Sequence, residues 1–267
     1  MGEVLVVTSG KGGVGKTTTT ANIGTALAMM GYRVVLLDAD IGLRNLDVVM
    51  GLENRIVYDL VDVTNGRCRL KQALIRDRRF ESLLLLPAAQ TKDKTAVNPE
   101  QMKALCDELK QESDYVLVDC PAGIEQGFKN AVAGADKALV VTTPEVSAVR
   151  DADRIIGLLQ ADTEMHHPLL IINRFRPQMV RRGDMLDVDD VNEHLAIELL
   201  GIVPEDESVI VSTNRGEPAV LNVNSRAGEA YRNISRRLMG EEVPFMDIES
   251  NGTFMGRIRR LLGMRTG

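Results

Sequence analysis

The stretch "GKGGVGKT", residues 10–17, decides the fold of this 267-residue chain. It fits the P-loop pattern G-x-x-x-x-G-K-T in full, with an aliphatic run before it and a helix-like stretch after it. In such a loop, backbone N–H groups surround phosphate oxygens at the N-terminus of the following helix. Lys16 is expected to neutralise the β- and γ-phosphates, and the Thr17 hydroxyl to ligate Mg²⁺. An accidental glycine-rich turn fits this context poorly. The residues expected to contact the nucleotide here are Gly10, Lys11, Gly12, Gly13, Val14, Gly15, Lys16, Thr17 and Thr18.

Short aliphatic runs alternate with longer helical patterns along the rest of the chain. The runs are continuous rather than alternating in polarity, which is typical of strands covered on both faces. This predicts an α/β fold with a doubly wound, mainly parallel sheet and helices on both faces, over residues 1–239. Strands are predicted at 4–7, 33–38, 82–88, 115–119, 137–142, 169–173 and 201–204, and helices at 17–30, 98–112, 145–160, 189–200 and 225–239.

The composition is that of a globular protein, with 44% hydrophobic and 26% charged residues. A net charge of −6 argues against a protein that wraps nucleic acid over its whole surface. The three cysteines show no CxxC spacing and are expected to be reduced thiols. Without a secretory signal or a long apolar run, a cytoplasmic protein is expected, at most peripheral on a membrane.

A second lysine in the loop, Lys11, needs an explanation of its own. At the start of the loop its side chain is expected to point away from its own nucleotide. It is either a solvated lysine or a cation that contacts phosphates bound by a second subunit, as an arginine finger does. Glu145 is expected either to hold Lys11 by its charge or to favour a helix start.

Three aspartates follow predicted strands and complete the expected site. Asp38 and Asp40 end the second strand, and Asp119 ends the run "YVLVD". Carboxylates at the carboxyl ends of parallel strands face the ligand crevice of an open α/β sheet. Asp40 is expected to position the attacking water, while Asp38 and Asp119 hold Mg²⁺ through water. For Asp38 and Asp40, a helix cap or turn is the alternative.

With its early lysine and the "DCPAG" segment at 119–123, the chain resembles the deviant Walker A (ParA/MinD) family of P-loop ATPases. The resemblance implies ATP and Mg²⁺ as cofactors and an ATP-dependent homodimer that encloses two nucleotides. Lys11 then crosses the interface and acts in catalysis with Lys16 and Asp40. Residues 38–47 and 119–125 correspond to the family's two switch segments, with Asn45 near the partner subunit.

The base is expected to be adenine. The guanine-specific NKxD pattern is absent, since residues 172–175 read "INRF". In the family, an Asn after this strand and a "PED" turn contact adenine, and this chain matches them with Asn173 and with Pro204, Glu205 and Asp206. The nitrogenase iron protein of the same family carries an iron–sulfur cluster, but for Cys120 a packed thiol is the favoured interpretation.

The end of the chain, "TFMGRIRRLLGMRTG" at 253–267, follows a polar segment at 240–252 that reads as a flexible linker. Its apolar side chains gather on one side of a helix and it contains no acids, which is typical of an amphipathic helix that binds an anionic membrane. A last helix packed on the core is the alternative. One tail binds weakly, whereas two tails on a dimer bind strongly. The expected membrane residues are Phe254, Met255, Arg257, Ile258, Arg259, Arg260, Leu261 and Leu262.

The tail and the segment "TTPEVSAVRDADRI" at 142–155 resemble the septum-placing members of the family. This implies a membrane-binding ATPase that regulates division-site placement. It would recruit a MinC-like inhibitor, leave the membrane after hydrolysis stimulated by a MinE-like protein, and sit on the inner face of the cell membrane when ATP-bound. The helix with Asp151 and Asp153 is expected to face these partners. A ParA-like ATPase for DNA or cargo segregation is the alternative.

Overall fold

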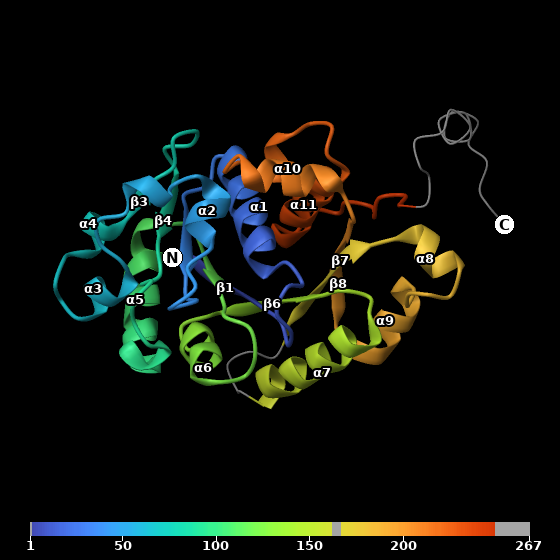
Figure 1. Cartoon of the computed structure of the whole chain (residues 1–267), viewed down its shortest axis with the longest axis horizontal. Coiled ribbons are helices and arrows are strands. Elements are labelled where there is room, and N and C mark those ends of the chain that lie inside the picture. The colour runs from blue at the N-terminus through green and yellow to red at the C-terminus, as the bar shows by residue number, and fades with distance from the viewer. Residues whose placement is uncertain (1, 162–166, 249–267) are drawn as a thin grey trace.

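The computed structural model describes residues 2–161 and 167–248. Its described residues form one eight-stranded sheet in the order β3-β4-β2-β5-β1-β6-β7-β8 (Figure 1). All neighbouring strands are parallel except β3 and β4, which pair antiparallel at one edge. The predicted doubly wound, mainly parallel sheet is therefore confirmed. The strands are β1 (Glu3–Thr8), β2 (Val34–Asp38), β3 (Ile75–Arg76), β4 (Leu83–Leu86), β5 (Tyr115–Asp119), β6 (Lys137–Thr142), β7 (Leu169–Phe175) and β8 (Glu198–Pro204).

Helices cover both faces of the sheet, with α1 and α11 on one side and α5, α6, α7 and α9 on the other (Figure 1). The longer ones are α1 (Lys16–Met29), α5 (Pro99–Glu112), α7 (Val146–Ala161) and α11 (Arg226–Leu238). The shorter ones are α2 (Leu46–Met50), α3 (Leu60–Thr64), α4 (Leu70–Ala73), α6 (Gln126–Val132), α8 (Pro177–Arg181), α9 (Val188–Leu195) and α10 (Glu207–Asn214).

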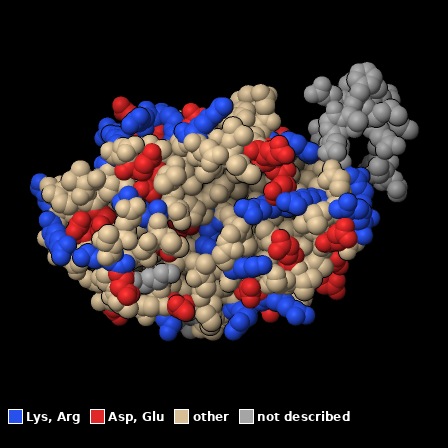
Figure 2. Space-filling view, in the orientation of Figure 1, with Lys and Arg blue, Asp and Glu red and all other residues tan. Residues whose placement is uncertain are grey.

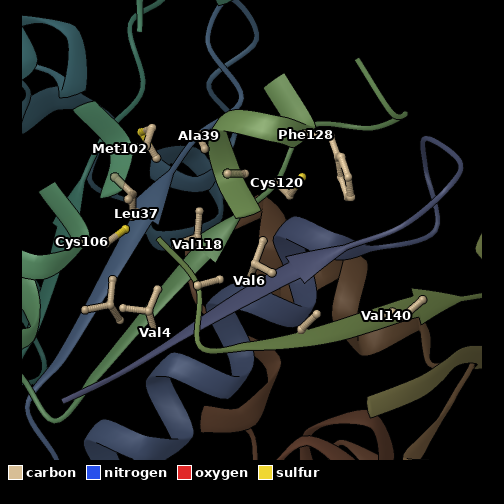
Figure 3. Packing of buried hydrophobic residues seen from close by; sticks show 14 of the residues in the cluster. Val4, Val6, Leu37, Ala39, Met102, Cys106, Val118, Cys120, Phe128 and Val140 are labelled. Carbon is tan, nitrogen blue, oxygen red and sulfur yellow. The ribbon is translucent and has the colours of Figure 1, made fainter. Parts of the chain in front are cut away.

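The core lies in two layers, one on each face of the sheet. In β1, Val4 and Val6 belong to one buried cluster, and Leu5 and Val7 to the other. This alternation explains why residues 4–7 of the strand are all apolar, since neither face meets water there. Figure 3 shows the first layer, where the strand residues lie with Phe128 of α6.

Two cysteines lie in this same layer. Cys106 of α5 and Cys120, which follows β5, are both buried among apolar side chains (Figure 3). Burial raises the pKa of each thiol to about 12, so both stay protonated at neutral pH. Among the described residues, no group of three or more His, Cys, Asp and Glu side chains is placed to hold a metal ion.

The prediction of a helix at 189–200 is wrong for the second half of this range. Helix α9 ends at Leu195, and Ala196 takes a left-handed conformation with φ 51°. The aliphatic residues that follow belong to β8, which pairs with β7. The helical pattern of α9 runs directly into the aliphatic residues of β8. No glycine or proline stands between them, so the sequence carries no signal for the end of the helix.

The segment after α11 bears on the predicted linker. Its described part, residues 240–248, contains no helix or strand and lies against the body, with Ile248 only 7% exposed. The division into an ATPase domain, a linker and a tail stays a prediction. Residues 249–252 and the predicted membrane helix at 253–267, with all eight of its expected membrane residues, lie outside the described residues. No helix that the structure describes is long and apolar enough to cross a bilayer.

Candidate active site

The P-loop connects β1 to α1 at the carboxyl edge of the sheet. Gly13 and Gly15 have φ angles of 78° and 100°, which side chains other than glycine rarely adopt. Gly15 is also the N-cap of α1 and provides no side-chain cap to the first turn. The N–H groups at this helix start are the natural ligands of a phosphate.

A serine that the sequence analysis missed fixes the two loop lysines relative to each other. Ser9 accepts a hydrogen bond of 2.9 Å from Lys16 Nζ and donates one of 2.7 Å to the backbone oxygen of Lys11. Both Ser9 and Lys16 are buried. Lys16 is therefore held along the inside of the loop, where it was predicted to meet phosphates. Ser9 directly precedes Gly10, the first glycine of the motif, and this position was the signal that could have identified it.

The two predicted magnesium carboxylates lie on neighbouring strands in register. Asp38 ends β2 and pairs with Asp119, which ends β5, and both are buried. Burial raises the pKa of Asp38 to about 8, and the charge of Asp119 adds to the shift. Burial also raises the pKa of Asp119 to about 7, although Thr17 and Lys16 favour its charged form. Two such carboxyls side by side are unfavourable in their ionised form unless a cation joins them.

The oxygen donors of this site fit Mg²⁺. Thr17 lies near enough to Asp119 to lower the pKa of that carboxyl, and Thr20 Oγ1 donates to its Oδ1 at 3.5 Å. Mg²⁺ prefers hydroxyl, carboxylate and phosphate oxygens and is commonly bound by one or two carboxylates with water and substrate phosphates. Thr17, Asp38 and Asp119 would hold the ion, which would supply positive charge to the terminal phosphates.

Asp38 also organises the loop that follows it. Its Oδ1 accepts a hydrogen bond of 2.9 Å from the backbone N–H of Asp40, and its Oδ2 accepts one of 3.2 Å from that of Leu46, the first residue of α2. One buried carboxylate thus sets the path of residues 38–46. Asp40 lies on this path, and its charge raises the pKa of both Asp38 and Asp119. The predicted water-positioning residue is therefore beside the metal site.

Lys11 points away from the P-loop of its own chain. Its Nζ lies 3.2 Å from Ser147 Oγ and 3.8 Å from Glu145 Oε2, and the side chain is 44% exposed. The expected proximity of Lys11 and Glu145 is therefore found at the start of α7. An ion pair between two exposed side chains contributes little, about 0–1 kcal/mol, so Lys11 can leave it at small cost.

The predicted base-contacting residues lie together at the ends of β7 and β8. Asn173 is buried beside the P-loop, with Nδ2 donating to the Val14 backbone oxygen at 2.7 Å. Its Oδ1 accepts from the N–H of Arg174 at 2.9 Å. The structure thus gives Asn173 a bracing role in the loop that the sequence analysis missed, and its contact with adenine stays a prediction. Pro204 ends β8, and Asp206 caps α10 through the Ser208 N–H.

The residues predicted to face partners lie on the surface around this edge. Asn45 precedes α2 and is exposed, and Asp153 is exposed on α7. Asp151 is half-buried because its backbone packs against Gly10 of the P-loop. The first switch also has a strained residue, Arg44, with φ 44°. The structure therefore brings the P-loop, the three aspartates and the start of α7 to one edge.

The fold and this edge define a P-loop nucleotide-binding protein. The chain matches the family described as the CobQ/CobB/MinD/ParA nucleotide binding domain over residues 5–219. The septum site-determining protein MinD of Bacillus subtilis is 62% identical over 268 residues, covering 100% of both chains. The chain therefore belongs to the CobQ/CobB/MinD/ParA family.

Solved structures give the same result. In the MinC:MinD cell division protein complex of Aquifex aeolicus, a chain 52% identical is matched with a TM-score of 0.85, covering 91% of this chain and 98% of that one. A Pyrococcus horikoshii septum site-determining MinD complexed with Mg-ADP is 29% identical, with a TM-score of 0.81 and coverages of 89% and 96%. These matches confirm the predicted ATPase class, with ATP and Mg²⁺ as its cofactors and division-site placement as its field of action.

Proposed function

We propose that this chain is a dimerising, membrane-binding ATPase that places the division site. ATP draws two subunits together, each supplies Lys11 to the other's triphosphate, and the paired tails hold the dimer on the membrane. The dimer recruits a MinC-like inhibitor, and hydrolysis stimulated by a MinE-like protein releases it. The chain then alternates between the cytoplasm and the inner face of the membrane.

The position of Lys11 is the observation that carries this proposal. A lysine inside a phosphate-binding loop is directed to the start of α7 rather than to its own site, where a hydrogen bond to Ser147 and a weak surface ion pair with Glu145 hold it. A second subunit facing the same edge would offer it a triphosphate, a much stronger anion. Positive charge that arrives only in the dimer stabilises the charge that develops during phosphoryl transfer.

The distribution of charge supports a membrane role for the tail rather than the body. On the face shown in Figure 2, Lys and Arg are interspersed with Asp and Glu. A face of this kind has weak attraction to an anionic surface. The tail sequence has four arginines and no acid over residues 253–267. Each arginine near an anionic membrane contributes about 1 kcal/mol.

Partner binding is assigned to the surface around α7. The related Aquifex aeolicus structure is a MinC:MinD complex. In this chain the exposed acid Glu145 and the exposed apolar Val146 lie at the start of α7, near Lys11, and the exposed Asp153 lies about two turns further along the helix. A partner seated there could sense whether Lys11 is engaged in the dimer.

Liposome co-sedimentation tests the proposal with ATP, with ADP and without nucleotide. The chain is expected to pellet with anionic vesicles only with ATP. A variant lacking residues 254–265 is expected to dimerise with ATP but stay in the supernatant. Equal pelleting in all three nucleotide states, or unchanged pelleting of the truncated chain, would contradict the proposal. Salt-sensitive DNA binding that persists after truncation would instead favour a segregation protein.

A further inference from the structure

Residues 243–248 form an extended segment, here called the strap, that runs back along α11. Arg237, near the end of that helix, donates hydrogen bonds to the backbone oxygens of Val243 at 2.8 Å and Pro244 at 2.9 Å. Its guanidinium also lies 4.3 Å from the ring centroid of Phe245, a cation–π distance. A third hydrogen bond, 3.0 Å long, goes to Leu200 in β8. One arginine therefore joins the start of the strap to α11 and to the sheet.

The far end of the strap is held by the first residue of the same helix. Arg226 Nη2 donates to the backbone oxygen of Asp247 at 2.9 Å. Arg226 and Arg237 are 11 residues apart, so they project from nearly the same face, about 16 Å from each other along the axis. An extended segment of six residues spans about 20 Å. The strap thus matches the length of helix that holds it.

The strap ends at the cleft that the predicted base-binding loop lines. Ile248 is buried and lines a cleft of about 310 Å³ together with Pro204, Glu205 and Asp206. The loop is anchored to the same helix turn as the strap. Asp206 Oδ2 accepts from Ser225 Oγ at 2.8 Å and from the Ala227 N–H at 3.1 Å, on either side of Arg226.

We infer that the strap positions the base-binding loop, so that occupancy of the base site and docking of the strap stabilise each other. The inference rests on the proposed function, because it takes residues 204–206 as the base contacts. Ile248 forms part of the wall of the cleft that the loop also lines, while Arg226 and Arg237 position the strap. The described chain therefore ends at the predicted base site, and the segment predicted to bind the membrane follows it in the sequence. By linkage, the factor by which the strap raises nucleotide affinity is the factor by which nucleotide stabilises the strap.

Ile248→Ser tests this inference, with Val223→Ser as the matched control. Val223 is 82% exposed and adjoins Asn224 at the rim of the same cleft. Calorimetry would compare Mg-ADP, which has a base, with Mg-tripolyphosphate, which has none. Ile248→Ser is expected to weaken ADP binding by about 5- to 20-fold and to leave tripolyphosphate binding unchanged. Phe245→Ala should give a smaller loss of the same kind, and Val223→Ser no loss.

Hydrogen exchange of the wild-type chain provides the reciprocal measurement. ADP is expected to slow exchange in residues 243–248, and tripolyphosphate is not. An Ile248→Ser chain that loses neither ligand, or both equally, would overturn the inference and leave the proposed function standing. An exchange rate in residues 243–248 that is the same with and without ADP would overturn it as well. A wild-type chain that binds tripolyphosphate but not ADP would overturn both the base assignment and the inference.

Discussion

Two buried aspartates at the ends of strands show how differently this molecule treats a carboxylate. Asp77 follows β3, and although burial raises its pKa, hydrogen bonds from Arg79 outweigh this, so the pKa is lowered overall. Arg79 Nη2 lies 2.6 Å from Asp77 Oδ2, and Arg79 also donates hydrogen bonds to the backbone oxygens of Met50 and Gly216. Asp119, at the end of β5, has a raised pKa because burial dominates.

The difference separates a structural site from a functional one. The carboxylate of Asp77 has its counter-charge built into the fold, and the pair fastens the β3 edge to α2 and the end of α10. Asp119 shares its surroundings with Asp38 and Asp40, and its charge is fully balanced only when a cation is present. Ionisable groups whose pKa values are shifted against ionisation are typical of binding and catalytic sites.

The largest expected effect is on catalysis. Asp119→Asn should reduce Mg²⁺-dependent ATP hydrolysis by at least about 100-fold, because the site loses a carboxylate that is predicted to hold the ion. Without nucleotide and metal, the same variant should be more stable than wild type by about 1 kcal/mol, since a buried charge is removed. A phosphate-release assay and urea unfolding with chelator measure the two effects. A destabilised variant would contradict the comparison.

The same substitution at Asp77 should act in the opposite direction on stability. Asp77→Asn leaves Arg79 half-buried without its counter-charge, which should lower the free energy of unfolding by about 3 kcal/mol. ATP hydrolysis per folded molecule should stay within twofold of wild type, because Asp77 lies away from the P-loop. Urea titration with the ATPase assay run on the same samples checks both. Loss of activity without loss of stability would contradict the structural role.

A smaller effect is expected from pH. Because the folded-state pKa of Asp77 is lowered, its contribution is present above the unfolded pKa of about 4 and is lost as the pH falls through the folded value. The destabilisation by Asp77→Asn should therefore shrink below pH 4. With chelator, the stabilisation by Asp119→Asn should instead grow as the pH rises from the unfolded pKa of about 4 to the raised folded pKa of about 7, and level off above it, because only the unfolded state ionises in that interval. Parallel pH profiles for the two variants would contradict the assignment.

The sheet, the P-loop and the three aspartates at the carboxyl edge of the sheet could be predicted from the sequence because their signals are local. Continuous aliphatic runs, a glycine pattern between strand and helix, and acids directly after strands each need only a few residues to be read. The two-residue strand β3 was missed because its pairing with β4 is a tertiary contact. Ser9 and the bracing role of Asn173 were missed because each depends on a partner brought near by the fold.

The strap shows what composition leaves out. Residues 240–252 contain acids, glycine and proline and are predicted to be a linker, which stays a prediction; within their described part, Phe245, Met246 and Ile248 contact the body. Their apolar side chains were a readable signal. The arginines that hold the segment, Arg226 and Arg237, lie on another element and could not be paired with it from spacing alone.

The central claim is that a neighbouring subunit completes each site with Lys11. Mixing Lys11→Ala with Asp40→Ala subunits tests it directly, because each variant alone should be inactive. In a mixed dimer, the Lys11→Ala subunit keeps Asp40 and receives Lys11 from its partner. We predict that equal mixing restores about a quarter of wild-type hydrolysis, since half of the dimers are mixed and each has one complete site. No recovery, although mixed dimers form, would show that Lys11 serves its own nucleotide and would contradict the account.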